Sequence, residues 1–468
     1  MMGKKSGQMQ MIMMDICSLI PENHLLKRIA HYIDFDFIYE KAAPYYSDIG
    51  RPSIDPVCMM RMLIVGFLYG INSERRLTED VSLNLAYRWF CGFELTDKIP
   101  DHSLFSQNRR RRFTDNGIFA EIFNHIIREC VEKGIVTGKV VSDGTFIPAN
   151  VAADSLIELH EKIEQSTVRY MEALDEELRQ QPGYQEPVPI VKEKTTLKST
   201  TDPDCGYINQ ESKKGLGYLA EMTVDTNSGI VLGVDCHPAN RRESDNILSH
   251  LSKIRPSTGI AINTLALDAG YDVGAVHRGL ELLKITGYVS PIQFSYDVLK
   301  RGLEYQPEAD CFQCMAGKSL NFVRLVYKRT SQNYYRLYRM PVADRKFCQN
   351  CEHFSECAFA REEPRVNVSS FYPAFFRNRQ RFDSPMYKVM KRLRSIWAEG
   401  TFAVLKREHN LKRAVKRGLR RVHEECLLSA MALNLKRMVK AMDKRYAETL
   451  QRFYHRVFKR IIVMFAII

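Results

Sequence analysis

The fold of this chain is decided by a stretch that reads Lys139-Val140-Val141-Ser142-Asp143-Gly144-Thr145-Phe146-Ile147. A β-branched run leads into a carboxylate, a glycine follows at once, and Pro148 closes the stretch. This pattern predicts a buried strand that carries Asp143 at its exposed end.

A second stretch has the same design and reads Thr264-Leu265-Ala266-Leu267-Asp268-Ala269-Gly270-Tyr271-Asp272. Its short apolar strand again ends in an acid, Asp268. If the two strands are neighbours, their carboxylates come close together and repel each other, which makes them a poor basis for a core. Such a pair usually holds a divalent cation. The sequence therefore predicts a cation site between Asp143 and Asp268.

Length, charge and cysteine usage limit the class of protein. The chain has 468 residues, a net charge of +13 and twelve cysteines, and its length predicts about two to four domains. Lys and Arg are concentrated in runs, which favours a nucleic-acid partner, although a generally basic soluble protein is the alternative. We expect no membrane span, since no stretch reaches about 20 apolar residues. A large chain with mostly scattered cysteines, without a secretion signal, fits a reducing cytoplasm.

Residues 1–137 are predicted to form an all-helical DNA-binding domain. Asp55 before Pro56, Ser73, and Asp101 are typical helix N-caps. Several short helices that end in a run of arginines resemble a helix-turn-helix reader of DNA. A solvated helical bundle is the alternative. The residues expected to contact DNA here are Arg109, Arg110, Arg111 and Arg112.

Residues 138–294 are predicted to be the first part of a catalytic core. A strand at Tyr218–Val224, a turn at Asp225–Gly229 and a return strand to Asp235 predict a hairpin. A helix from about residue 244 to 254, the Asp268 strand, a second helix and a strand at residues 287–292 follow. The order predicts a mixed sheet with helices against it. Within this part, residues 151–200 are interpreted as an insertion, with an amphipathic helix from Asp154 to about Gln181 and then a linker.

Residues 295–375 are predicted to form a cysteine-rich, zinc-ribbon-like insertion. Cys311 and Cys314 make one CxxC pair, Cys348 and Cys351 make another, and Cys357 follows. Paired knuckles of this spacing suit a tetrahedral structural Zn²⁺ site. We expect Cys311, Cys314, Cys348 and Cys351 as ligands, with Cys357 able to replace one of them. Reduced cysteines that bind no metal are the alternative.

Residues 376–441 are predicted to complete the core, and residues 442–468 to form a basic tail. Glu399 and Lys406 lie seven residues apart on a predicted helix, so they share a face. A basic run follows, part of which is expected to contact DNA phosphates; a solvated basic helix is the alternative. The candidate DNA contacts in this part of the chain are Lys406, Arg407, Lys412, Arg413, Lys416 and Arg417.

Together, the three acids resemble the DDE-type transposases of bacterial insertion sequences. Asp143 lies on a first strand, Asp268 on a fourth with Gly270-Tyr271 after it, and Glu399 on a later helix. Gly144 departs from the family, in which a Ser or a similar small residue is expected after the first acid. Further motifs similar to the family are Gly50–Pro56, Tyr87–Phe90, Pro100–Ser103, Asp268–Asp272, Leu405–Arg407 and Asn410–Leu411.

The resemblance implies an α/β (α+β) fold with an RNase H-like, mixed five-stranded sheet and flanking helices. It also implies that Asp143, Asp268 and Glu399 hold two Mg²⁺ or Mn²⁺ ions for DNA cleavage and strand transfer. Lys406 would steady a phosphate near the cut.

The implied partners are double-stranded DNA, both element ends and target, and a second copy of the chain in a homodimer or larger synaptic complex. No nucleotide cofactor is expected, because the sequence contains no Walker loop. The expected localisation of the protein is the bacterial cytoplasm, in association with the nucleoid when the protein is bound to DNA. Two alternatives stay open: a DNA-binding protein without catalysis, such as a domesticated transposase, and an RNase H-fold nuclease that cuts but does not join.

Overall fold

The structure is a computed structural model and describes residues 15–47, 49, 53–114, 116–210, 213–292, 302–357, 359 and 363–465. The chain divides into two compact units. Unit 1 comprises residues 1–130, 405–411 and 427–468, and unit 2 comprises residues 131–404 and 412–426. The motif residues 50–52 and the expected domain boundary at residue 295 lie outside the described residues. Within the described part, we find no helix with the length and apolar character needed to cross a membrane.

All regular secondary structure in the described residues of unit 1 is helical. The side chains of Asp55, Ser73 and Asp101 each accept a hydrogen bond from an amide of the helix that follows, so the three predicted N-caps are confirmed. The N-terminal elements are η1 (Ile16–Leu19), α1 (Leu25–Tyr32), α2 (Phe37–Ala42), η2 (Ala43–Tyr45), α3 (Pro56–Leu68), α4 (Glu74–Leu83), α5 (Leu85–Phe90), α6 (His102–Arg112) and α7 (Ile118–Glu132), whose last residues belong to unit 2.

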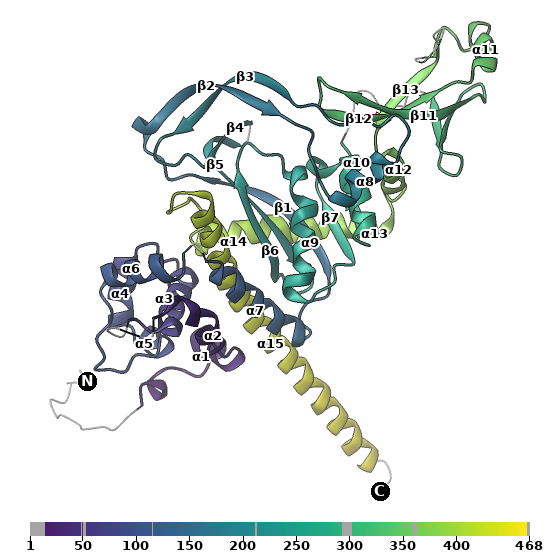
Figure 1. Cartoon of the computed structure of the whole chain (residues 1–468). Coiled ribbons are helices and arrows are strands. Elements are labelled where there is room, and N and C mark those ends of the chain that lie inside the picture. The colour runs from purple at the N-terminus through teal and green to yellow at the C-terminus, as the bar shows by residue number, and fades with distance from the viewer. Residues whose placement is uncertain are drawn as a thin grey trace, which may run out of the picture. The chain divides into compact units, whose positions relative to one another are not determined.

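Unit 2 is built on a mixed six-stranded sheet, seen at the centre of Figure 1. The strand order is β4-β5-β1-β7-β8, and β6 pairs with β5. Strands β5 and β6 form the predicted antiparallel hairpin, whereas β7 lies parallel to β1 and to β8. The strands are β1 (Lys139–Pro148), β4 (Gly206–Gln210), β5 (Lys213–Asp225), β6 (Val231–Pro238), β7 (Thr264–Leu267) and β8 (Thr286–Val289).

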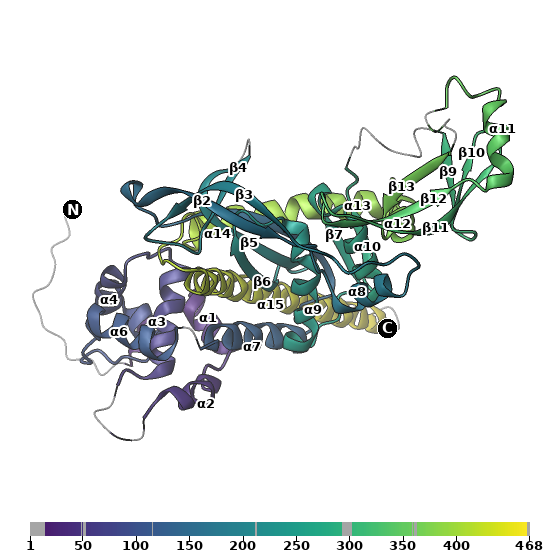
Figure 2. The ribbon, with the colours of Figure 1, turned by 45° about the horizontal axis from the view of Figure 1, so that its top comes forward.

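The sheet has six strands and not the five expected, and β4 is the additional one. It has a partner because the first residues of β5 extend beyond the part that pairs with β6. The predicted strand at Lys139–Ile147 is confirmed, but Asp143 does not lie at its end. Strand β1 continues to Pro148, since β5 pairs with it from Val140 onward. The helix α9 (Ile247–Thr258) packs against β6 (Figure 2). The helix α10 (Gly274–Leu282) packs against β8.

The predicted helix from Asp154 to Gln181 is wrong over its first half. Residues Leu156–Gln165 form strand β2, which pairs antiparallel with β3 (Ile190–Ser199), and only α8 (Glu172–Arg179) is helical. The two strands form a separate sheet with mostly exposed side chains. Because neither face is covered, the apolar alternation that identifies a strand is absent. Cross-strand polar pairs support it instead, such as Glu161 with Lys198 at 2.7 Å.

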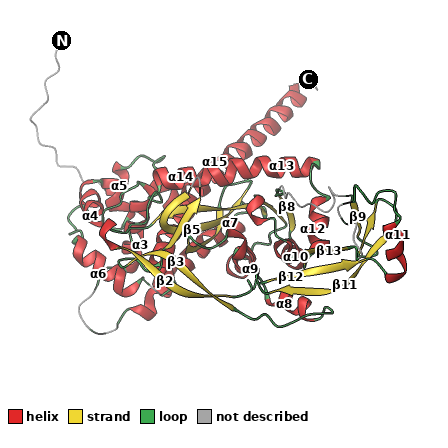
Figure 3. Ribbon diagram, turned by 90° about the horizontal axis from the view of Figure 1, so that it is seen from above, coloured by secondary structure: helices red, strands yellow, loops and turns green. Residues whose placement is uncertain are grey.

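A second sheet holds the cysteine-rich region. Its five strands are antiparallel in the order β13-β12-β11-β10-β9 (Figure 3). Its core is aromatic, with Tyr305, Phe312 and Tyr338 nearly inaccessible to solvent. The elements of this region are β9 (Leu303–Gln306), β10 (Cys311–Cys314), β11 (Ser319–Lys328), β12 (Asn333–Arg339), η7 (Val342–Asp344), α11 (Arg345–Gln349) and β13 (Arg365–Ser369).

The C-terminal part returns to helices. The predicted apolar helix at Cys426–Leu435 is confirmed as part of the long helix α15. Residues 409–418, which include most of the basic run, form an irregular loop and not a helix. The C-terminal elements are α12 (Tyr372–Arg379), α13 (Pro385–Arg394), the π-helical η8 (Ser395–Glu399), α14 (Gly400–Glu408) and α15 (Leu419–Phe465). Three further short 3-10 helices lie earlier in the chain, in unit 2: η3 (Ala153–Ser155), η4 (Glu243–Asp245) and η5 (Ala269–Tyr271).

A buried carboxylate, Asp225, stabilises the turn between β5 and β6, and its removal tests how much it contributes to stability. Asp225 is fully buried and accepts hydrogen bonds from amide and hydroxyl groups of Thr137 and Ser228 and from the amide of Asn227. We predict that Asp225→Ala lowers the free energy of unfolding by roughly 3 kcal/mol, because several buried donors lose a charged acceptor. Urea unfolding measures this. Asn227→Ala is the control, expected to cost less than about 1 kcal/mol; equal costs would contradict the assignment.

Candidate active site

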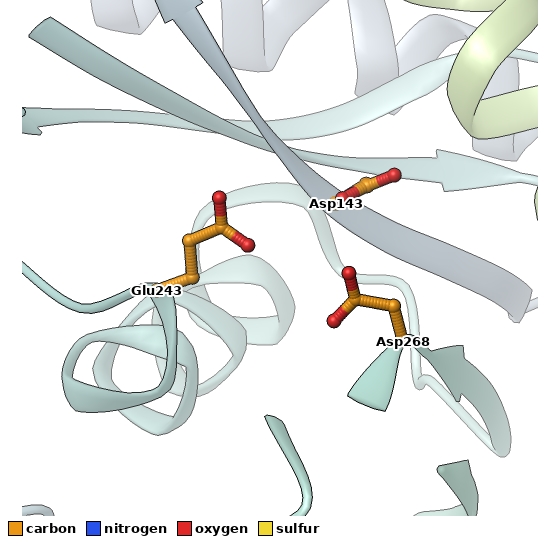
Figure 4. Close-up of side chains that lie close together, drawn as sticks. All are labelled: Asp143, Glu243 and Asp268. Carbon is orange, nitrogen blue, oxygen red and sulfur yellow. The ribbon is translucent and has the colours of Figure 1, made fainter. Parts of the chain in front are cut away.

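Three carboxylates converge beside the central sheet. One oxygen from each of Asp143, Glu243 and Asp268 can be chosen so that all three lie within 4.8 Å of one another (Figure 4). Asp143 lies on β1, Glu243 begins the 3-10 helix η4, and Asp268 directly follows β7. Three different elements therefore build this carboxylate cluster, the acidic cluster.

The register of the parallel strands places two of the acids. Val141 on β1 pairs with Ala266 on β7, and this is the last pair between these strands. Asp143 and Asp268 each lie two residues beyond that pair. Because side chains alternate between the two faces of a strand, both acids point to the same face and stand at the same level. The pairing of two apolar strands thus fixes the spacing of the two carboxylates.

Glu243 reaches the cluster because residue 144 has no side chain. A Cβ atom built on Gly144 would lie 2.9 Å from both Cδ and Oε1 of Glu243, closer than carbon and these atoms can pack. The side chain of Glu243 is 19% exposed and lies directly over this glycine. Gly144 therefore gives the third carboxylate its place, which accounts for the departure from the small polar residue expected there.

Two cations neutralise part of the cluster. Arg394, the last residue of α13, lies with Nη1 2.9 Å from Oδ2 of Asp143. Lys213, the first residue of β5, lies with Nζ 3.1 Å from Oε1 of Glu243. Asp268 is held differently: its Oδ1 accepts a hydrogen bond from the amide of Gly270 at 2.8 Å. Three acids with two cations leave the cluster with an excess of negative charge.

Burial and repulsion shift the carboxylates toward their protonated forms. Burial, and then the charge of Asp268, raises the pKa of Asp143 to about 6 despite the guanidinium of Arg394. Burial also raises the pKa of Glu243, against the effect of Lys213. Such shifts are typical of acids grouped for a function and not for stability.

A further acid lies buried next to the cluster. Glu221 on β5 stands opposite Gly144 in the sheet and is 1% exposed. Its Oε1 accepts a hydrogen bond from the hydroxyl of Tyr271 at 3.1 Å. Burial raises the pKa of Glu221 to about 7. The Glu221–Tyr271 pair connects β5 to the residues that follow Asp268, and so supports the turn that presents this acid.

The acidic cluster fits a divalent cation. Mg²⁺ binds oxygen ligands at about 2.1 Å, so oxygens on opposite sides of one ion lie about 4.2 Å apart. The three oxygens lie within 4.8 Å of one another, and a small inward movement would bring them to that spacing. Carboxylate oxygens are also the ligands that Mg²⁺ and Mn²⁺ prefer.

The structure brings Asp143 and Asp268 together as predicted, but Glu399 is not part of the acidic cluster. Glu399 is exposed at the end of the π-helical segment η8, which contacts β1 and β5. Arg394, which contacts Asp143, directly precedes this segment and lies five residues before Glu399. Asp272 is structural: its oxygens contact His277 at 2.8 Å and Arg379 at 3.0 Å.

The four arginines of α6 have different environments. Arg109 is buried and forms an ion pair with Glu74 at 2.8 Å. The expected contact of Arg109 with DNA is therefore corrected, because its guanidinium is buried and already paired with a carboxylate. Arg112 stacks over the ring of Tyr46, 4.1 Å from its centroid. Arg110 and Arg111 are exposed. A single helix presents consecutive residues on all of its sides, which is why only part of the run faces solvent.

The basic run after α14 is an anchored loop, not the solvated helix weighed above. Its amides at Ala414 and Gly418 donate to Pro148 and Asp202, respectively, and Nε of Arg417 donates to the carbonyl of Asn150 at 2.8 Å. Lys412, Arg413 and Arg417 are exposed, whereas Lys416 is half-buried. On α14, Arg407 is exposed and paired with Glu408, and Lys406 is half-buried. The loop is thus fixed beside the end of β1.

The expected zinc ligands are only partly brought together. Cys314, Cys348, Cys351 and Cys357 line one cavity, but Cys311 does not. The choice of Cys311 as a ligand is therefore wrong. Cys311 and Cys314 are three residues apart on β10, and residues at odd spacing on a strand point to opposite faces.

Sequence reasoning missed Glu243 and Arg394. Glu243 follows two arginines in the connection from β6 to α9, where an acid is an ordinary helix-start residue. One signal was available: Gly144, directly after the first acid, indicates that something approaches the strand closely. No comparable signal marks Arg394, which is one of several basic residues on α13.

We predict that the metal-free protein becomes less stable as the pH rises from about 4 to about 7. The folded protein keeps protons on Asp143, with a pKa of about 6, and on Glu221, with a pKa of about 7, that the unfolded chain has already lost. The shift of Asp143 alone corresponds to about 3 kcal/mol. Mg²⁺ or Mn²⁺ should raise the melting temperature more at about pH 8 than at about pH 5, because the metal needs ionised ligands. Thermal melts with and without chelator measure both; a metal effect independent of pH would contradict the site.

We predict that Gly144→Ala weakens divalent-metal binding at least about tenfold while the fold is kept, since the new methyl group must displace the carboxylate of Glu243. Titration calorimetry with Mn²⁺ measures this affinity. Gly400→Ala is the matched control, because a Cβ there meets no atom within 4 Å. Wild-type affinity in Gly144→Ala would show that Glu243 is no ligand.

Comparison with solved structures gives only distant similarities. A piggyBac transposase synaptic complex with hairpin DNA is 9% identical, with 90% of this chain and 81% of that chain covered and a TM-score of 0.30. A Mos1 transposase paired-end complex is 11% identical, with 56% and 75% covered and a TM-score of 0.16. No curated protein matches the chain.

Two family models match separate parts of the chain. Residues 14–111 match the transposase domain DUF772, and residues 313–439 match a transposase DDE domain. The second match includes Arg394, Glu399 and the basic loop, whereas the acidic cluster lies outside both matched segments. The chain thus contains two domains of transposase families, the second of which is a DDE domain.

Proposed function

We propose that this chain binds the ends of an insertion sequence and catalyses their metal-dependent cleavage and strand transfer. The observation that carries the proposal is the convergence of Asp143, Glu243 and Asp268, whose oxygens lie within 4.8 Å of one another. Two of these acids were expected from the sequence as members of a catalytic set, and they meet on neighbouring parallel strands.

An RNase H-like core is part of this proposal. In support, β6, β5 and β1 follow one another as antiparallel neighbours, and β7 and β8 continue the sheet in parallel beyond β1. The acids lie where the parallel pair ends. Open sheets commonly bind ligands at the carboxyl ends of their parallel strands.

The acids would share the work of holding metal ions. Asp143 and Asp268 form the fixed pair, Glu243 completes the cluster, and Glu399 is the candidate fourth acid, one π-turn after Arg394. When bound, Mg²⁺ or Mn²⁺ would help to activate a water or a DNA 3′-hydroxyl and to stabilise the leaving oxygen. Arg394 lies 2.9 Å from Asp143, so it is placed to contact a phosphate that approaches this carboxylate.

Basic groups in both units would hold DNA. In unit 1, Arg110 and Arg111 are exposed at the end of α6. In unit 2, the loop that carries Lys412, Arg413 and Arg417 is anchored beside the end of β1, the strand of Asp143. Phosphate contacts from such groups would make the affinity for DNA fall steeply with salt. Joining two element ends would also require at least two copies of the chain in one complex.

The decisive experiment is strand transfer with Mg²⁺, using DNA that carries the inverted repeats flanking the gene. We predict that Asp143→Asn and Asp268→Asn each lower cleavage and transfer at least about 1000-fold, because both acids are needed to hold the ions. Glu243→Gln and Glu399→Gln, compared side by side, tell which of the two is the third essential acid.

Matched controls are available for each variant. Asp245→Asn changes a neighbouring acid of η4 that lies outside the cluster, and Glu408→Gln changes an acid of α14 paired with Arg407. Both should keep wild-type activity. Full activity of Asp143→Asn would refute the site. Cleavage without joining would favour a nuclease, and DNA binding without cleavage in the wild type would favour a catalytically silent protein.

A further inference from the structure

A cavity outside the acidic cluster is lined by four thiols. Cys314, Cys348, Cys351 and Cys357 surround a space of about 30 Å³ at the edge of the β9–β13 sheet. All four are free cysteines. This volume is large enough for a water molecule or a single metal ion. The four residues come from two segments, the end of β10 and the connection between β12 and β13, which are far apart along the chain.

Packing shows that the thiols share one side of the sheet. Cys314, Cys348 and Cys357 all pack against the aromatic core that includes Phe312. Phe312 and Cys314 are two residues apart on β10 and so point to the same face. Burial, and then the nearness of Cys314, Cys351 and Cys357, raises the pKa of the Cys348 thiol. Cys348 also lines the same cavity as the other three thiols.

Short turns bring the third and fourth thiols, Cys351 and Cys357, into place. The amide of Cys351 donates to the carbonyl of Cys348 at 3.3 Å, and the amide of Cys357 donates to the carbonyl of His353 at 2.9 Å. On the other side, the amide of Gly317 donates to the carbonyl of Cys314 at 2.8 Å, with Gly317 at a φ of +74°. Cys314 therefore lies at the start of a tight hairpin turn that only a residue like glycine closes easily.

The lining of the cavity does not suit water. Apart from the four thiols and His353, it consists of apolar and sulfur-containing side chains, among them Leu303, Leu320 and Met340. A buried water needs about two to four good polar partners, and thiols are weak ones. Four thiolates are, in contrast, the ligand set of a tetrahedral soft metal, with Zn–S bonds of about 2.3 Å. No three of these sulfur atoms lie within 4.8 Å of one another in the metal-free chain, so the metal would draw them together.

We infer that Cys314, Cys348, Cys351 and Cys357 form a structural tetrathiolate zinc site. The site joins the hairpin after β10 to the connection between β12 and β13. The described residues of that connection form η7, the short helix α11 and turns. Its other links to the hairpin are few, such as the ion pair of Lys318 with Asp344 at 2.8 Å. Zinc would close a loop that has little secondary structure to hold it.

The test is zinc analysis of the full chain, purified without added metal. Wild type should hold about one zinc per chain, and Cys314→Ser and Cys351→Ser should hold close to none. Cys311→Ser is the matched control, because Cys311 lies on the same strand but outside the cavity, and it should keep its zinc. His353→Asn should also keep it. A wild type without zinc, or zinc lost in Cys311→Ser or in His353→Asn, overturns the inference.

Two further measurements remain informative if the serine variants fold poorly. Cobalt substituted into wild type should give the absorption of a tetrahedral cobalt–thiolate centre with sulfur ligands only; a spectrum with nitrogen ligation would overturn the ligand set. Chelation of wild type should expose Cys348, Cys351 and Cys357 to thiol reagents and open residues 345–357 to proteases. Unchanged reactivity after the metal has been removed would contradict the structural role. Neither result depends on strand transfer, so this site can fail without affecting the proposed catalysis.

Discussion

Mutual repulsion of carboxylates is the constraint on which the site depends. Acids at this spacing destabilise the metal-free fold, so other interactions must hold them in place. The parallel pairing of β1 with β7 does this for Asp143 and Asp268, since backbone hydrogen bonds fix both strands up to the pair Val141–Ala266. The surrounding apolar strands provide the stability that the acids remove.

The third acid shows how closely the site is packed. Glu243 enters over a glycine, with Lys213 on one side and the carboxylate of Asp268 nearby. A serine or alanine at position 144 would take the space that the carboxylate occupies. The glycine at position 144 and the presence of Glu243 in the cluster therefore have a single steric explanation.

The cysteine-rich sheet follows the same logic with a different ligand chemistry. Its aromatic core holds β10 in place, and the alternation of the strand separates Cys311 from Cys314. A metal between Cys314 and the connection from β12 to β13 would add order where the described chain has little regular secondary structure. Oxygen ligands at the acidic cluster and sulfur ligands at this cavity would select different metals, so that the two sites need not compete.

The sequence by itself determined the elements whose pattern is local. Alternation and β-branching predicted β1 and the β5–β6 hairpin, and N-cap residues predicted the starts of α3, α4 and α6. Two acids after apolar strands predicted two of the three members of the acidic cluster. What only the tertiary structure decided depends on contacts between distant segments. Glu243 joins Asp143 across about 100 residues. Because side chains alternate along β10, Cys314 lines the cavity that Cys357 also lines, whereas Cys311 does not. The exposed hairpin β2–β3 escaped prediction because its strands bury neither face and so show no periodic pattern.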